Sequence, residues 1–267
     1  MKYAVITGDH PRHLAFLHFI STVVEVDAVF IEKREAMSPP EGEVNKDALS
    51  LNDKHFANRL NKELEYFGQY ESMSEGLSNI YSFSGEEGFS DQMCGALQKI
   101  KPDVVFSFGT LAVAKIIQPR FSGVIDFINL NTGLVQKYNG DATLFWPFYF
   151  LEPNWAGGTF HFVNDKPEEH SVIHQFVPEL EYGDTIHDVG CKVVACVEPE
   201  IKKLLQVLES GGELVEHRFN QSPNTYSLTD FKVAHLVVIY ELFDDKIVDR
   251  YLDGDFGSTP VNLHQAI

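Results

Sequence analysis

Short apolar runs that alternate with segments of helical periodicity are the feature that most constrains the fold of this chain. Runs at 1–7 (MKYAVIT) and 23–31 flank a segment at 12–22 whose apolar residues recur at helical spacing. Two further runs, at 103–108 (DVVFSF) and 123–130, flank another helical segment at 111–117. Both runs are apolar on both faces, which is typical of central parallel strands. The pattern predicts an α/β fold with a doubly wound, mostly parallel sheet, whose ligands bind at the carboxyl ends of the strands.

The remaining segments are less regular. A polar segment after the second run predicts long loops with helices near 53–66 and 90–100. The alternating residues at 158–164 predict a strand that pairs with a strand at 171–177 across a charged loop at 165–170.

The C-terminal part predicts a helix over 185–211 and a tail of strands and turns from residue 226. We therefore divide the chain into a domain at 1–212 and a small C-terminal α+β extension at 213–267. The extension could cover a sheet edge, add to the core, pack on the substrate side or form a homodimer contact.

Charge and cysteine content restrict the function. Asp and Glu total 39 against 21 Lys and Arg, a formal net charge of −18, which opposes broad contact with a phosphate backbone. Cys94, Cys191 and Cys196 lack CxxC or Cys/His metal spacing and fit reduced thiols. The apolar runs are shorter than the roughly 20 residues that cross a bilayer. We expect a soluble, cytoplasmic protein with neither a nucleic-acid nor a membrane partner.

The stretch INLNTG follows the last of the buried runs and holds two carboxamides, Asn129 and Asn131. They alternate along a strand end, so both amides face the same side. Amide N–H groups can stabilise a developing oxyanion and do not ionise. Alternatively, Asn131, Thr132 and Gly133 only close a turn. These residues alone leave both interpretations open.

Other motifs give weaker signals. GxGxxG, GxxxxGK[ST] and GxSxG are absent, so dinucleotide-binding, P-loop and serine-hydrolase functions lack their signatures. The first turn (GDHPRH) could bind an anionic part of a substrate at a helix N-terminus with the help of Arg12 and His10, or it is a surface turn. His161, His170 and His174 cluster in sequence, but nothing specifies the three or four convergent ligands of a metal site, so we expect no metal.

Two longer segments carry a resemblance to a known family. FINLNTGLVQKYNG, a helical stretch with Trp146, and GGTFHFVNDKPEEHSVIHQ follow one another in this order. They resemble the folate-dependent formyltransferase family, which shows iNxHPSLLPkYrG, a helix and then GxTxHxVxxxxDxGxIIxQ at similar separation. The matching positions are Asn129, Lys137, Tyr138, Gly140, Gly158, Thr159, His161, Val163, Ile173 and Gln175.

The resemblance implies a catalytic set with two substitutions. In the family an amine attacks the formyl carbon of 10-formyltetrahydrofolate, while Asn, His and Asp stabilise the oxyanion and handle protons. These positions fall on Asn129, Asn131 and Glu168. Glu168 keeps a carboxylate, but Asn131 cannot titrate as imidazole does, so general acid catalysis, worth roughly 10²–10⁴-fold, is lost or supplied elsewhere. His170, two residues beyond Glu168 in the same loop, is a hypothetical replacement acid; the alternative is a solvated loop histidine.

The same resemblance narrows the acceptor. Members that act on glycinamide ribonucleotide have a glycine-rich loop after the first strand, which TGDHPRHL does not match, and methionyl-tRNA formyltransferases carry a basic appendage that this acidic chain lacks. The chain is more similar to nucleotide-sugar N-formyltransferases. The implied function is formyl transfer from 10-formyltetrahydrofolate to a primary amine of a small molecule, such as an amino sugar. Two alternatives stay open: binding of folate or a metabolite without transfer, and a different acyl or carbamoyl transfer.

Overall fold

The computed structural model describes most of the chain. The described residues are 1–33, 46–70, 77, 79–84, 89–164, 169–220, 222 and 224–267.

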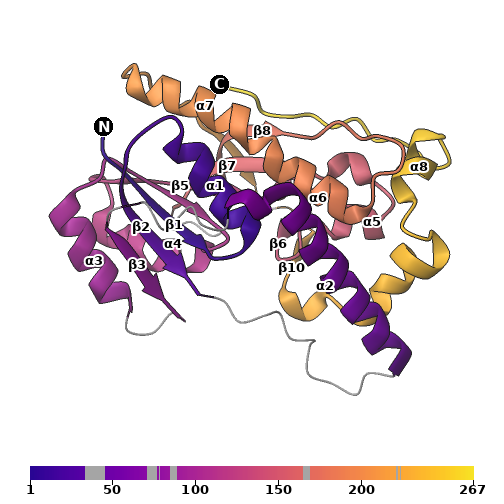
Figure 1. Ribbon diagram of the computed structural model, residues 1–267. Helices are drawn as coiled ribbons and strands as arrows, with labels where there is room; N and C mark the ends of the chain where they lie inside the picture. The colour runs from indigo at the N-terminus through magenta and orange to yellow at the C-terminus, as the bar shows by residue number, and fades with distance from the viewer. Residues whose placement is uncertain are drawn as a thin grey trace.

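In this part of the chain, eight strands form one mixed sheet in the order β3-β2-β1-β4-β5-β7-β8-β9 (Figure 1). The first five strands of this order are parallel, and the last three run antiparallel to their neighbours. The predicted α/β fold with a mostly parallel sheet is confirmed. The strands are β1 (Tyr3–Gly8), β2 (Val26–Glu32), β3 (Ile80–Phe83), β4 (Val104–Phe108), β5 (Asp126–Asn131), β7 (Gly158–Phe162), β8 (Glu169–Phe176) and β9 (His217–Asn220).

Helices cover both faces of the sheet (Figure 1). Apolar side chains of α1 and α7 pack on one face, and those of α3 and α4 pack on the other. The helices are α1 (Pro11–Ser21), α2 (Lys46–Phe67), α3 (Phe89–Ile100), α4 (Leu111–Ile117), α5 (Trp146–Tyr149), α6 (Ile186–Ala195), α7 (Val197–Glu209) and α8 (Ile247–Leu252). A separate parallel pair joins β6 (Asn139–Gly140) to β10 (Thr225–Tyr226).

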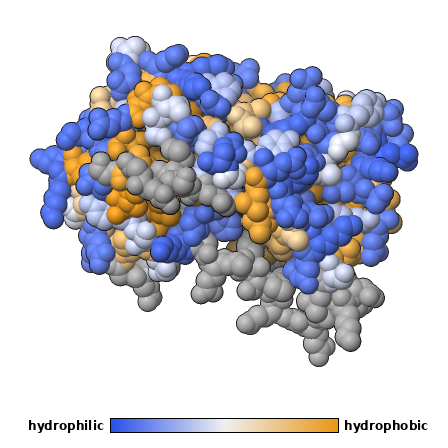
Figure 2. All heavy atoms as spheres, in the orientation of Figure 1, coloured by the Kyte–Doolittle hydropathy of each residue, from blue (hydrophilic) through white to orange (hydrophobic). Residues whose placement is uncertain are grey.

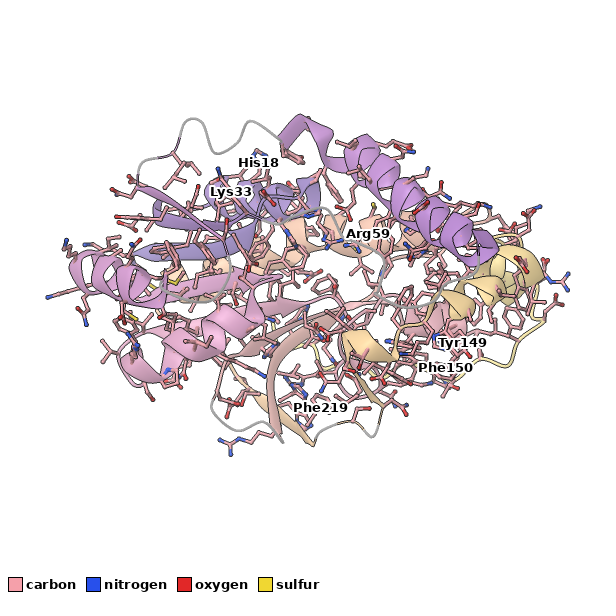
Figure 3. All side chains as sticks on the ribbon, turned by 90° about the horizontal axis from the view of Figure 1, so that it is seen from below. His18, Lys33, Arg59, Tyr149, Phe150 and Phe219 are labelled. Carbon is pink, nitrogen blue, oxygen red and sulfur yellow. The ribbon has the colours of Figure 1, made fainter. Side chains whose placement is uncertain are left out.

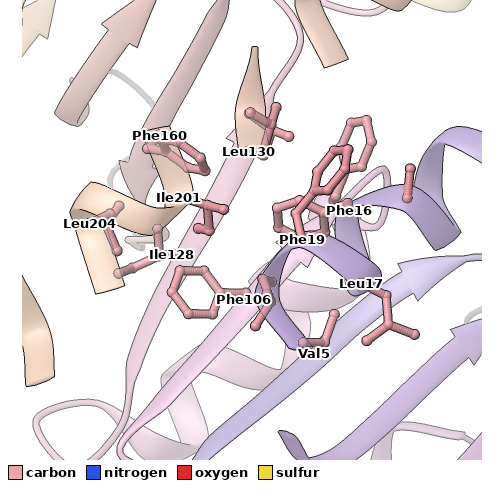
Figure 4. Close-up of a cluster of buried hydrophobic side chains, with 14 of the residues drawn as sticks. Val5, Phe16, Leu17, Phe19, Phe106, Ile128, Leu130, Phe160, Ile201 and Leu204 are labelled. Atoms are coloured by element: carbon pink, nitrogen blue, oxygen red, sulfur yellow. The ribbon is translucent and has the colours of Figure 1, made fainter. Parts of the chain in front are cut away.

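The central strands are apolar on both faces because each face contacts helices. Along β1, Val5 belongs to the cluster under α1 and α7, whereas Ala4 and Ile6 belong to the cluster under α3 and α4. Figure 4 shows the first cluster, in which Phe106 and Ile128 of the sheet meet side chains from the two helices. This double burial explains why the runs that predicted the strands are continuous rather than alternating.

The C-terminal part differs from the predicted pattern in two places. The single helix expected over 185–211 is two helices, because Pro199 has no N–H for the carbonyl of Ala195 and its ring would clash there. The prediction of strands in the tail is wrong at two segments: Val233–His235 forms a 3-10 turn, and Val238–Leu242 forms a π-helical turn. The buried Val233, Leu236, Ile239 and Tyr240 follow helical spacing, and this spacing overrides the β-propensity of the run.

The division at residue 212 stays a prediction. Strand β9 lies beyond that position and pairs with β8, so the extension supplies the edge strand of the main sheet. Leu236 and Ile239 of the tail pack in one buried cluster with Trp146 and Val189. The extension therefore shares its core with the first 212 residues.

The surface is largely polar. Figure 2 shows hydrophilic side chains over most of the face in view, as the net charge of −18 leads one to expect. Within the described residues, no helix combines the length and apolarity that a membrane crossing requires.

Candidate functional site

A cavity of about 660 Å³ lies at the carboxyl ends of β4 and β5. Its walls come from the sheet, from the start of α1, from one face of α2 and from α6, and Figure 3 shows Arg59 of α2 over the middle of the molecule. Polar residues on the walls include Arg12, His55, Arg59, Glu63, Asn129, Asn131, Thr132, Thr143 and His187, and apolar ones include Phe56, Phe108, Leu111, Phe145 and Phe231. The position agrees with the strand-end site expected for a doubly wound sheet.

Asn129 is held in a row of polar side chains that crosses three strands. Strand pairing places Ser107 beside Asn129 and Asn129 beside His161. The Ser107 hydroxyl donates to Asn129 Oδ1 at 2.8 Å, and Asn129 Nδ2 lies 3.0 Å from His161 Nε2. All three residues are buried, with Asn129 2% exposed. These contacts fix which side of the carboxamide is oxygen and which is nitrogen.

The protonation of His161 determines what Asn129 can still offer. Burial lowers the pKa of His161 to about 4, so the ring is neutral at pH 7. Its Nδ1 lies 3.1 Å from the Phe162 carbonyl and donates to it, which leaves Nε2 as the acceptor for one Asn129 amide hydrogen. Because Asn129 also lines the cavity, its second amide hydrogen is available to a ligand. An amide held in this way is able to donate to an oxyanion, and this role of Asn129 stays a prediction.

Asn131 lines the same cavity two residues further along β5. The turn that follows is closely packed, since the Thr143 hydroxyl donates to the Thr132 carbonyl and a Cβ on Gly133 would lie 2.6 Å from Thr143 Cβ. INLNTG is therefore both a packed turn and a cavity wall. The catalytic roles of its two amides remain predictions.

Arg12 lines the cavity, whereas His10 is not among the lining residues. Arg12 Nη1 and Arg59 Nε bind the same oxygen of Glu63, Oε1, at 2.6 and 2.8 Å. Glu63 is 4% exposed. Of the two residues predicted to bind substrate, the structure thus brings Arg12 to the site, next to a second arginine from α2.

The two residues predicted from the family's Asp-x-Gly turn have different outcomes. Glu168 lies outside the described residues. His170 was expected in a loop and lies instead in β8, because residues 169–172 pair with β9. Its ring is 6.0 Å from the ring of His161 and does not line the cavity, and burial with nearby Lys115 lowers its pKa.

Sequence reasoning missed the two imidazoles that do line the cavity, His55 of α2 and His187 of α6. A signal for the first was present, because His55, Arg59 and Glu63 recur at intervals of four on one helix face. A polar stripe that the structure buries marks a helix face turned towards a site rather than towards solvent. Across the described chain, no three His, Cys, Asp or Glu side chains converge as a metal site.

A scan against protein-family models finds no match to this chain, and a search of curated proteins finds none either. Solved structures do match. The phosphoribosylglycinamide formyltransferase of Anaplasma phagocytophilum is 14% identical, with a TM-score of 0.55 over 85% of this chain and 98% of that one. A sugar N-formyltransferase from Shewanella sp FDAARGOS_354 is 14% identical, with a TM-score of 0.52 over 86% and 78% of the two chains.

A third match is WlaRD, a sugar 3N-formyl transferase whose structure was determined in the presence of dTDP and 5-N-formyl-THF. It is 15% identical, with a TM-score of 0.50 over 87% of this chain and 71% of that one. Identities this low show the fold alone, and the three matches agree on it. The resemblance seen in the sequence is confirmed at that level: the chain has the formyltransferase fold.

Proposed function

We propose that the protein transfers a formyl group from 10-formyltetrahydrofolate to a primary amine of a small molecule, such as an amino sugar. The observation that carries this proposal is the position of Asn129 in the strand-end cavity of a formyltransferase fold. One of its amide hydrogens bonds His161, and the other can donate to a ligand. The presence of 5-N-formyl-THF with the similar WlaRD supports a folate donor.

The residues have distinct roles in this reaction. The amine lone pair forms a bond to the formyl carbon, and the formyl oxygen becomes an anion that Asn129 stabilises by donation from Nδ2. Asn131 is the second donor, and Glu168 takes the amine proton. As the oxyanion re-forms the C=O bond, the C–N bond to the folate breaks and its electron pair stays on the folate nitrogen, which receives the proton that Glu168 took from the amine.

The cavity has the chemistry that such substrates need. Phe108, Leu111 and Ala112 give it an apolar wall beside Asn129, which suits a flat heteroaromatic donor. On the helix side, Arg12 and Arg59 both line the cavity beside Glu63, and their guanidinium groups can donate to an anionic part of the acceptor.

The test is a transfer assay with purified protein, 10-formyltetrahydrofolate and a panel of primary amines, followed by folate absorbance and product mass. Asn129→Ala should lower kcat by about 10²–10³-fold, the usual loss for one oxyanion donor. The matched control is Asn154→Ala, since Asn154 bonds the Thr259 carbonyl and does not line the cavity. Wild-type protein that forms no product with any amine would refute the proposal.

A second function is favoured by one specific observation. Asn131 stands where the formyltransferase pattern has a titrating imidazole, so a protein that binds folate or a metabolite without transfer also fits. Saturable folate binding with no turnover would support this function over the first.

A further inference from the structure

Three buried side chains form a hydrogen-bonded chain at the helix-lined end of the cavity. Tyr240 Oη lies 2.9 Å from His55 Nδ1 and 3.1 Å from His187 Nε2. The two imidazole rings are 4.6 Å apart. Exposed fractions of 7%, 7% and 6% for His55, His187 and Tyr240 show that bulk water hardly reaches them. No step proposed above uses these residues.

The Tyr240 hydroxyl has one proton, so it donates to one of the two rings and accepts from the other. In one of these two directions, His187 carries its own hydrogen on Nδ1 and turns a lone pair on Nε2 towards Tyr240. A neutral His187 then accepts the Tyr240 hydroxyl proton at Nε2. The Tyr240 oxygen in turn accepts the Nδ1 hydrogen of His55. In that direction, His55 is left with an unprotonated Nε2.

Burial keeps both rings neutral. It lowers the pKa of His55 to about 4 and that of His187 well below its usual value. Among the described residues, His55 makes its ring hydrogen bond through Nδ1, so the lone pair on Nε2 has no protein donor. Because His55 lines the cavity, a ligand in the cavity can donate a hydrogen bond to that lone pair.

Aromatic rings surround this acceptor. Phe145 and Phe231 each lie 6.2 Å from the His55 ring and 4.9 Å from one another, and both line the cavity. Flat apolar rings beside one fixed acceptor suit a ligand with a C–H face and a hydroxyl group, as a sugar ring has. An apolar amine would fill the same space and leave Nε2 unpaired.

We propose that His55, Phe145 and Phe231 form an acceptor subsite that selects hydroxylated ring amines, in which a ligand hydroxyl donates to His55 Nε2 and the ring packs on the two phenylalanines. The identification of this ligand as the formyl acceptor rests on the proposed function. Tyr240 is a positioning residue, because it acts by fixing the tautomer of His55.

The first test reads the tautomer directly. In protein labelled with ¹⁵N-histidine, NMR should show His55 protonated at Nδ1 and bare at Nε2 near pH 7, and D-glucosamine should shift the Nε2 resonance. Tyr240→Phe should abolish the tautomer preference while the protein stays folded. A wild-type His55 that carries its proton on Nε2 would overturn the subsite.

The second test measures selectivity between D-glucosamine and cyclohexylamine, a ring amine without hydroxyls. An unpaired buried acceptor costs about tenfold to hundredfold in affinity, so wild-type protein should prefer glucosamine by that factor in binding, read by tryptophan fluorescence. His55→Phe should bring the ratio close to one, and His55→Gln, whose carboxamide oxygen can still accept, should keep part of it. His18→Gln is the control, because His18 lies on α1 and does not line the cavity.

The outcomes separate the two proposals. A preference that His55→Phe leaves unchanged, or wild-type protein that binds glucosamine no better than cyclohexylamine, overturns the subsite. If His55→Phe does not fold, the same comparison is made with His55→Gln, which must lower the ratio. Selective binding that depends on His55, without formyl transfer to any amine, overturns the proposed function and leaves the subsite standing.

Discussion

The neutral state of His161 predicts that the folded protein loses stability in acid. The pKa of His161 is about 4 in the folded protein and ordinarily 6.5. Between pH 4 and pH 6.5, His161 is therefore protonated in the unfolded chain but neutral in the folded protein. The stabilising contribution is fully present above pH 6.5 and is lost as the pH falls towards 4. A shift of this size corresponds to about 3 kcal/mol, because one pKa unit is roughly 1.4 kcal/mol.

A variant isolates this contribution from the other titrating groups. Burial also lowers the pKa of His55 and His187, which acts in the same direction as His161, and raises the pKa of Asp245 to about 6, which acts in the opposite direction. The wild-type curve alone therefore mixes several effects. His161→Gln removes the titration but keeps an acceptor for Asn129 Nδ2. The free energy of unfolding of wild-type protein, minus that of the variant, should fall by about 3 kcal/mol between pH 7.5 and pH 4.

Urea titrations followed by the fluorescence of the buried Trp146 and Trp155 measure both proteins at each pH. The difference at pH 7.5 serves as the reference for any loss of packing in His161→Gln. Two curves that stay parallel down to pH 4 would refute the reasoning, because His161 would then titrate alike in the folded and unfolded states. That result would also remove the argument that a neutral His161 accepts a hydrogen bond from Asn129 Nδ2.

Three further predictions address catalysis, backbone geometry and the tail. Asn131→His should raise kcat for formyl transfer by roughly 10²–10⁴-fold if imidazole is the missing group, and an unchanged kcat would favour the binding function. Gly109→Ala should lower the free energy of unfolding by about 1–3 kcal/mol more than the control Gly123→Ala, both measured in urea. Both glycines have φ near +73°, at +74° and +72°, but only at Gly109 would a Cβ meet His13, at 2.5 Å. Ile239→Ala should cost about 2–5 kcal/mol because Ile239 is fully buried, whereas Leu242→Ala, at a position 68% exposed, should change stability by less than about 0.5 kcal/mol.

The elements that could be predicted from the sequence are those whose local pattern agrees with their packing. Strands β1, β4 and β5 are buried on both faces and read as continuous apolar runs, and α4 was predicted at the bounds it has. Strand β3 was missed because IYSF is short, lies on a sheet edge and is mostly incompletely buried. Such a strand is defined by its neighbour β2 rather than by its own residues.

The site shows the same division between local and distant information. Asn129 and Asn131 could be found because both follow from one strand end and its spacing to the next strands. His55 and His187 are separated by 132 positions in the numbering, and they meet only because α2 and α6 pack together. No local pattern encodes that meeting, so the sequence pointed instead to His170, two residues beyond Glu168.

The row formed by Ser107, Asn129 and His161 argues for a ligand on grounds of energy. These polar residues lie side by side across three strands whose buried residues are mostly apolar, and apolar residues there would pack without the cost of desolvating polar groups. Their hydrogen bonds to one another offset that cost but do not exceed it by much. Stability therefore does not account for the row. Ligand binding by Asn129 accounts for it, because Ser107 and His161 orient the Asn129 amide and Asn129 lines the cavity. This explanation of the row does not depend on whether residue 131 is a histidine or an asparagine.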